Sequence, residues 1–221
     1  MVTDMATIHD CSEPDELLAG MRLARTAIGR GELVVLPTDT VYGVAADAFS
    51  TAAVQRLLDA KGRTRQSPPP VLIPSLAALD ALAAEVPPEV RWLVDAFWPG
   101  ALTVILPARD SLHWDLGETA GTVALRMPKN PVALELLAET GPLAVSSANL
   151  TGESAASTAA EAHRMLGDSV SVYLDAGETG QLGSTIIDAT GLLTGGELRV
   201  VRSGGISDGQ IARVLRDGAA A

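Results

Sequence analysis

The chain has 221 residues, 47% of them hydrophobic but only 3% aromatic, so its core must consist mainly of Ala, Val, Leu and Ile. This length fits one domain with a sizeable core. The net charge of −11 argues against a general RNA or DNA binder, because such proteins neutralise phosphates with Lys and Arg. The single cysteine, Cys11, excludes an intramolecular disulfide and favours a reducing, cytoplasmic compartment. No apolar run approaches the roughly 18 residues of a membrane-spanning helix, so no membrane association is expected.

The first half of the chain predicts alternating helices and strands. Ser12 is expected to cap a helix that ends at Gly31, and Thr51 to cap a helix that runs into Lys61. A polar loop that ends in three prolines, residues 63–70, follows the second helix. In chain order, the predicted segments are helix 12–31, strand 32–36, the extended or turning segment 41–46, helix 51–61, strand 70–73, and helices 76–84 and 88–97.

The second half continues this alternation. Asn130 is expected to cap a helix that begins with Pro131, and Ser207 with Gln210 to form a capping box for the last helix. Because strands and helices interleave without repeats or a low-complexity linker, we expect one α/β domain with an open, mixed sheet. In chain order, the predicted segments are strands 101–106 and 122–127, a helix from 131, strand 143–146, a helix from 158, strands 170–174, 184–188 and 198–201, and a helix after 207.

Lys61 and Arg63 form the first polar cluster of interest. Positive charge at a helix C-terminus is favourable by itself, so this pair has an interpretation that needs no ligand. Arg63, however, lies beyond the helix stop at Gly62, and residues 56–65 carry a local charge of +3. Such a patch is too small for a nucleic-acid duplex and suits a small phosphorylated ligand, which Arg can grip with two hydrogen bonds.

A second polar cluster, Ser146-Ser147-Ala148-Asn149, follows a predicted strand. Ligands of open α/β sheets bind beyond the carboxyl ends of strands, and alternate residues of an extended chain share a face. An Asx or Ser turn explains the cluster equally well. The same two interpretations, ligand contact or local turn, remain open for Thr38-Asp39-Thr40 and Gly183-Ser184-Thr185.

Several familiar site signatures do not fit the sequence. It contains neither a P-loop nor a G-x-G-x-x-G dinucleotide fingerprint. Residues 205–209 match a nucleophile elbow formally, but no histidine follows Ser207 to complete a triad, and a helix cap explains this serine better. His9, His113 and His163 are scattered, so no zinc site is expected.

Six segments of the chain occur in the order and spacing of one known family. The chain resembles the YrdC family, in the short single-domain form of the threonylcarbamoyl-AMP synthases, over residues 12–215. The resemblance implies an open twisted mixed sheet flanked by helices, with residues 1–11 and 216–221 as terminal tails. The segments that carry it are PTDTVYG (37–43), KGR (61–63), FWPG (97–100), VALRMP (123–128), SANL (147–150) and GST (183–185).

The resemblance implies a reaction in which L-threonine, bicarbonate or CO2, and ATP give threonylcarbamoyl-AMP and pyrophosphate. Mg²⁺ is expected to accompany ATP as a substrate complex rather than to occupy a protein metal site. The product is expected to pass to a tRNA threonylcarbamoyl transferase, with weak or no direct tRNA binding by this chain. This chemistry requires positioning and charge stabilisation more than a protein nucleophile.

The resemblance also implies roles for individual residues. Lys61 and Arg63 match the catalytic pair of the family. The residues implied in ATP binding are Arg63, Ser67, Thr122, Ser147, Asn149 and Arg202. The residues implied in threonine binding are Thr40, Arg126, Val145 and Ser184.

Three positions depart from the family pattern. Many members have a His that contacts the amino acid where this chain has Leu72, which implies altered threonine recognition. Ala155 stands where a Ser that touches the nucleotide is common, so one contact is expected to be lost. Ser203 replaces a common Pro beside Arg202, a change that should be tolerated because the Arg is kept.

Two alternatives from other functional classes remain open. A non-catalytic RNA-binding protein of the same fold is one, although the charge of −11 argues against it. A module that transfers a carbamoyl group through a related adenylate is the other, but in the family such modules lie inside much longer chains.

Overall fold

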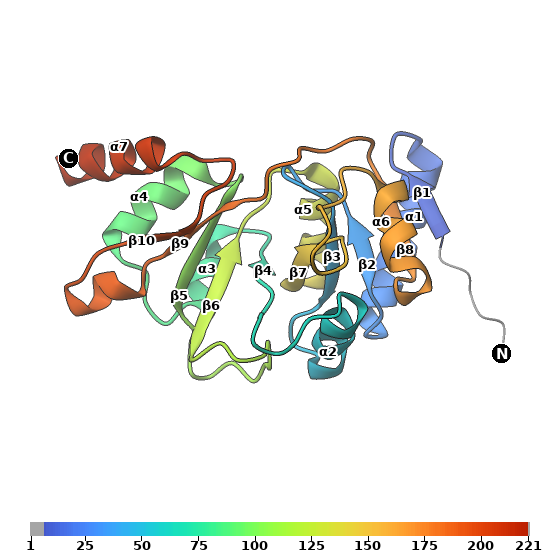
Figure 1. Cartoon of the computed structure of the whole chain (residues 1–221), viewed down its shortest axis with the longest axis horizontal. Helices are drawn as coiled ribbons and strands as arrows, with labels where there is room; N and C mark the ends of the chain where they lie inside the picture. Colours follow the sequence, from blue (N-terminus) through green and yellow to red (C-terminus); the bar gives the residue numbers. More distant parts are fainter. Residues whose placement is uncertain (1–6, 221) are drawn as a thin grey trace.

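The computed structural model describes residues 7–220. Within this range the chain forms one ten-stranded mixed sheet and seven α-helices, which confirms the α/β prediction (Figure 1). The strands are β1 (Thr7–Asp10), β2 (Val34–Leu36), β3 (Gly43–Asp47), β4 (Val71–Leu72), β5 (Leu102–Pro107), β6 (Thr122–Arg126), β7 (Leu143–Ser147), β8 (Val172–Asp175), β9 (Thr185–Asp188) and β10 (Arg199–Arg202). The helices are α1 (Pro14–Gly29), α2 (Thr51–Ala60), α3 (Leu76–Leu82), α4 (Pro88–Phe97), α5 (Pro131–Thr140), α6 (Ala159–Leu166) and α7 (Asp208–Ala219). No helix in this range is long and apolar enough to cross a membrane.

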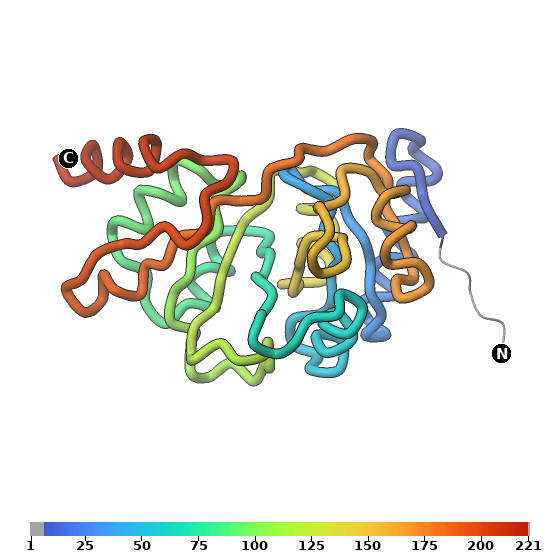
Figure 2. Tube along the Cα trace, viewed as in Figure 1, coloured from blue at the N-terminus to red at the C-terminus, as the bar shows by residue number. Residues whose placement is uncertain are grey.

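The sheet has two halves that meet at the very short strand β4. Its strand order is β1-β8-β2-β3-β7-β4-β6-β5-β9-β10. Strand β4 pairs antiparallel with β7 on one side and parallel with β6 on the other. We call β1, β8, β2, β3 and β7 the β8 half, and β6, β5, β9 and β10 the β5 half. The segment between β8 and β9 crosses from one half to the other (Figure 2).

Helices cover the β8 half on both faces, which explains its apolar strands. Val34 and Leu36 belong to a core cluster with α1 and α5, whereas Val35 between them packs with α2 and α6 on the opposite face. In the β5 half, α3, α4 and α7 pack on the face that carries Val104 and Leu125. The opposite face of these strands carries Thr103 and Arg126, which line a cavity.

Two predicted N-terminal caps are wrong by a residue. Glu13, rather than Ser12, is the N-cap of α1, and it makes no side-chain capping bond. The Ser12 hydroxyl instead donates to Asp10, because Pro14 already starts the helix. Ser50 caps α2 by accepting from the Ala53 N–H. The caps predicted at Asn130 and Ser207 are confirmed, the second as a full capping box.

Both ends of the chain hold elements inside the segments that we expected to be tails. Strand β1 pairs in parallel with β8 at an edge of the sheet. Helix α7 continues to Ala219. The remaining parts of the expected tails, residues 1–6 and 221, lie outside the described residues.

Candidate active site

A cavity of about 360 Å³ lies where the two halves of the sheet meet at β4. Both halves and the connecting loops contribute to its wall. From the β8 half and its loops come Thr38, Thr40, Val41, Tyr42, Gly43, Arg63, Val145, Ser146, Ser147 and Ala155. From β4 and the β5 half with its loops come Pro68, Pro70, Leu72, Thr103, Arg126, Gly183, Ser184, Ile186, Arg202 and Ser203.

Lys61 lies behind the cavity wall rather than in it. The side chain is fully buried, and its Nζ donates to the main-chain oxygen of Ser147 and, over 2.6 Å, to that of Asn149. The amide oxygen Oδ1 of Asn149 lies 3.3 Å from the same nitrogen. Burial, and then the charge of Arg63, lower the pKa of Lys61 to about 7. Lys61 therefore fixes the main chain of residues 147–149 against the end of α2.

Asn149 completes this support from the other side. Its Nδ2 donates to the main-chain oxygens of Leu150 and Glu153, over 3.0 and 2.7 Å. All the polar atoms of this buried amide thus have partners within the protein. The two polar clusters thus meet in the structure, with Lys61 and Asn149 in contact behind Ser147.

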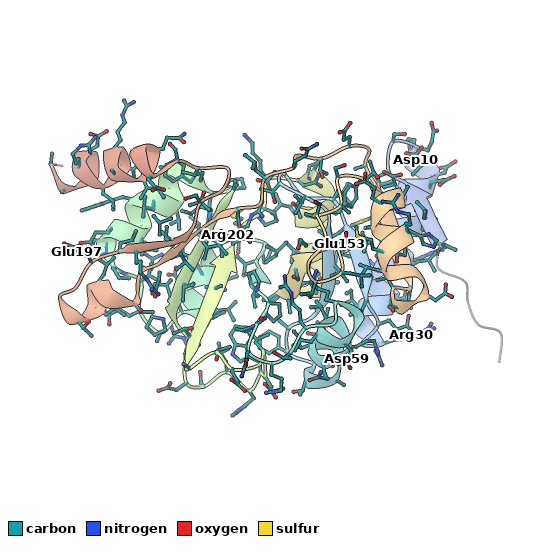
Figure 3. The ribbon with its side chains drawn as sticks, in the orientation of Figure 1. Asp10, Arg30, Asp59, Glu153, Glu197 and Arg202 are labelled. Atoms are coloured by element: carbon teal, nitrogen blue, oxygen red, sulfur yellow. The ribbon has the colours of Figure 1, made fainter. Side chains whose placement is uncertain are left out.

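Arg63 and Arg202 present their guanidinium groups to the cavity from opposite halves. Arg63 Nη1 donates to Ser146 Oγ over 3.0 Å. Arg202, which lies near the centre of the molecule in Figure 3, donates through Nε and Nη2 to the main-chain oxygen of Ser184 over 3.2 and 2.7 Å. Burial, and then the charge of Arg63, lower the pKa of Arg202. Two cations that face the same cavity and repel each other make a favourable site for an anion.

Arg126 is a third guanidinium at the cavity, and the protein holds it on three sides. Its Nε donates to Gly100 O over 3.0 Å, Nη1 to Thr40 Oγ1 over 2.8 Å, and Nη2 to Asp39 Oδ1 over 2.7 Å. Burial lowers the pKa of Arg126, and the carboxylate of Asp39 opposes that shift.

Thr103 is a wall residue that the sequence analysis missed. Its hydroxyl lies 2.7 Å from that of Ser184, which also accepts from Arg202 Nη2 over 3.2 Å. The only local signal is a lone threonine inside the apolar stretch 101–106. It does not indicate a site by itself, because its partner Ser184 is 81 positions away in sequence.

Seven of the predicted ligand residues line the cavity, namely Thr40, Arg63, Arg126, Val145, Ser147, Ser184 and Arg202. Three others do not. Asn149 is behind the wall, Ser67 is exposed on loop 63–70, and Thr122 lies in a neighbouring, mostly apolar cavity of about 350 Å³. The two cavities share Pro68, Pro70 and Ile186. All three departures from the family pattern, at Leu72, Ala155 and Ser203, lie in the wall of the first cavity.

Comparison with known proteins assigns the family. The profile of the Sua5/YciO/YrdC family, which carries the description "Telomere recombination", matches residues 26–204. The chain belongs to the Sua5/YciO/YrdC family. This confirms the resemblance drawn from the six sequence segments.

Relatives and solved structures of this family cover most of the chain. A Mycobacterium tuberculosis protein is 50% identical over 212 residues, 96% of each chain. The threonylcarbamoyl-AMP synthase of Bacillus subtilis is 37% identical, over 87% of this chain and 55% of the relative. The crystal structure of Pyrococcus abyssi Sua5 complexed with L-threonine matches with a TM-score of 0.85 and 34% identity, over 95% of this chain and 61% of that chain.

Proposed function

We propose that this protein is an L-threonylcarbamoyladenylate synthase, which makes threonylcarbamoyl-AMP and pyrophosphate from L-threonine, bicarbonate or CO2, and ATP. The observation that carries the proposal is the convergence of Arg63, Arg126 and Arg202 on one cavity. Among the described residues that line this cavity there is no carboxylate, imidazole or thiol. The cavity therefore suits two anionic partners, a triphosphate and an amino-acid carboxylate. Its hydroxyl groups have no carboxylate or imidazole base among the described wall residues to activate them, which suits a reaction without a protein nucleophile.

The proposed reaction has two steps. The amine of threonine attacks CO2, and loss of a proton leaves an N-carboxylate. An oxygen of this carboxylate attacks the α-phosphorus of ATP in line, and the bond to the bridging oxygen breaks to release pyrophosphate. Arg63 and Arg202 hold the phosphates and stabilise the charge that develops on the leaving pyrophosphate. The main chain of residues 147–149 holds the side chain of Ser147 beside the phosphates.

The amino acid is proposed to bind at the opposite end of the cavity, where Arg126 receives its carboxylate. Thr40 stands next to this carboxylate position. Its Oγ1 lies 3.0 Å from Thr38 Oγ1 and accepts from Arg126 Nη1 over 2.8 Å. As a wall residue beside Arg126, Thr40 is proposed to contact the amine of threonine. Ser184 contributes a second hydroxyl, and Val145 and Leu72 form the apolar wall.

The nucleoside is proposed to occupy the neighbouring cavity that contains Thr122. Its wall includes Pro69, Ile105 and Val123, apolar groups suited to the faces of a purine. We assign Lys61 and Asn149 as positioning residues, because both act on the main chain behind Ser147. Ser67 lies between Gln66 and Pro68, which both line this neighbouring cavity, and stays a predicted nucleotide contact.

ATP is proposed to bind as its Mg²⁺ complex. Among residues 7–220 no group of three or more His, Cys, Asp or Glu side chains is placed to hold a metal ion. The phosphates are therefore assigned as the ligands of Mg²⁺, which usually keeps several waters. The product is a reactive mixed anhydride, and we propose that a tRNA threonylcarbamoyl transferase consumes it in the cytoplasm, where both ATP and tRNA occur.

Pyrophosphate release tests the proposal. Purified protein is incubated with ATP, Mg²⁺ and bicarbonate, with and without L-threonine, and L-serine runs in parallel. We expect release that depends on threonine. Measurable ATP binding without release for any amino acid would contradict the proposal.

The RNA-binding alternative makes a different prediction. It requires salt-sensitive, sub-micromolar binding of tRNA or duplex RNA without ATP turnover, which a mobility-shift series measures. The charge of −11 favours weak or absent binding.

A further inference from the structure

The turn that follows β2 is held rigid by its own hydroxyl groups. Thr38 Oγ1 accepts from the main-chain N–H groups of Thr40 and Val41 over 3.1 and 3.2 Å while it donates to Val41 O. Asp39 lies between the two threonines of this closed turn. These hydrogen bonds restrain the backbone on the C-terminal side of Asp39.

The carboxylate of Asp39 joins the two halves of the sheet. Its Oδ1 accepts from Arg126 Nη2, at the end of β6, and from the main-chain N–H of Lys129, over 2.7 and 2.8 Å. The side chains of Asp39 and Arg126 are only 17% and 7% exposed. Asp39 is not a wall residue of the cavity, so it acts on a ligand only through Arg126.

The hydrogen bonds of Arg126 leave two of its N–H donors available to a ligand. A guanidinium has five N–H donors, and three of them have partners in Gly100, Thr40 and Asp39. Two donors remain on a side chain that lines the cavity. Two N–H groups in fixed positions match the two oxygens of a carboxylate.

We propose that Asp39 is a positioning residue that orients Arg126 toward the carboxylate of the amino-acid substrate. This inference rests on the proposed function. Asp39 holds one side of the guanidinium so that its free edge faces the cavity, and it balances one of three converging positive charges. Loss of the side chain frees Arg126 to turn toward the phosphates. Recognition of the carboxylate is lost, while recognition of the amine and side chain of the substrate remains.

Calorimetric titration with L-threonine and with L-threoninamide, which lacks the carboxylate, tests this role. Both ligands are titrated in the presence of a non-hydrolysable MgATP analogue. For Asp39→Ala we expect roughly tenfold or greater loss of threonine affinity, but less than about twofold loss for threoninamide. Asp39→Asn keeps an acceptor oxygen and should show a smaller loss of the same kind. If Asp39→Ala does not fold, this isosteric variant carries the test.

Asp188→Ala is a matched control. Asp188 is similarly buried, at 22% side-chain exposure, forms an ion pair with Arg199 and accepts from the Thr190 N–H, but its partner Arg199, unlike Arg126, does not line the cavity. We expect it to leave both affinities unchanged. Equal losses for threonine and threoninamide in the Asp39 variants, or no loss, would overturn the positioning role. Failure of the wild-type protein to bind threonine would overturn the proposed function itself. The wild-type titration alone shows this, so the two failures are distinguishable.

Discussion

Lys61 is an ammonium group in the interior of the protein, surrounded by three oxygens of residues 147–149. Three acceptors match the three N–H groups of a charged lysine, whereas burial favours the neutral form. The balance gives a pKa of about 7, well below the ordinary 10.5. The charge of Lys61 therefore changes around pH 7.

This pKa predicts a pH-dependent contribution of Lys61 to stability. Between about pH 7 and 10.5 the unfolded chain holds this proton and the folded chain releases it. The free energy of unfolding of the wild-type protein, relative to Lys61→Met, should therefore rise with pH in this window, by at most about 1.4 kcal/mol per pH unit. Urea titrations at pH 6 to 9 measure the difference. A difference that is flat or falls with pH would contradict the shift.

Arg63 differs from Lys61 because it reaches the cavity itself. Arg63→Ala should lower the rate of pyrophosphate release by about two orders of magnitude or more, since it removes a charged group from the phosphates. The fold should persist, because the side chain is only half-buried and donates one hydrogen bond. Activity assays and thermal unfolding of the same preparation check both parts. Wild-type turnover in this variant would show that the phosphates bind elsewhere.

At the scale of elements, the glycines at the end of β10 bring two segments into close contact. A Cβ at Gly204 would collide with the main-chain oxygens of Gly183 and Ser184, and the second of these is the oxygen that Arg202 binds. Gly204→Ala should destabilise the protein by about 1–3 kcal/mol and reduce activity by displacing Ser184. Gly209→Ala, in the first turn of α7, meets open space and should leave activity unchanged. If Gly204→Ala and Gly209→Ala had the same stability and the same activity, the close contact at Gly204 would be contradicted.

Elements with strong local signals could be predicted from the sequence, and elements that depend on distant partners could not. The helix caps at Asn130 and Ser207 need only neighbours three residues away. Strand β1, with the sequence TIHD, has no apolar run and exists because β8 lies beside it. The position of two-residue β4 at the centre of the sheet likewise depends on β6 and β7.

The candidate site shows the same difference between local signals and contacts with distant residues. The family resemblance identified the residues that contribute charge and hydroxyl groups, and six of them line one cavity. The burial of Lys61 could not be predicted, because a lysine after a helix usually reaches solvent. The bond between Asp39 and Arg126 joins residues 87 positions apart, a distance that no local pattern describes.

At the scale of the whole molecule, the cavity wall links two half-sheets whose shared strand, β4, has only two residues. A ligand that contacts both halves should therefore stabilise them together. At a hundred times its dissociation constant, a MgATP analogue with threonine should raise the free energy of unfolding by about 2.7 kcal/mol. Hydrogen exchange should slow in β3 and β7 as well as in β5 and β9. Protection confined to one half would show that the ligand does not bridge them.

The cavity wall draws on residues from Thr38 to Ser203. During synthesis on the ribosome, the guanidinium of Arg63 emerges long before that of Arg202, its counterpart across the cavity. With the proposed phosphate site, a nascent chain holds the triphosphate only after β10 has left the exit tunnel. Nucleotide binding by a nascent chain would therefore show that all residues of the cavity wall have been synthesised and have emerged.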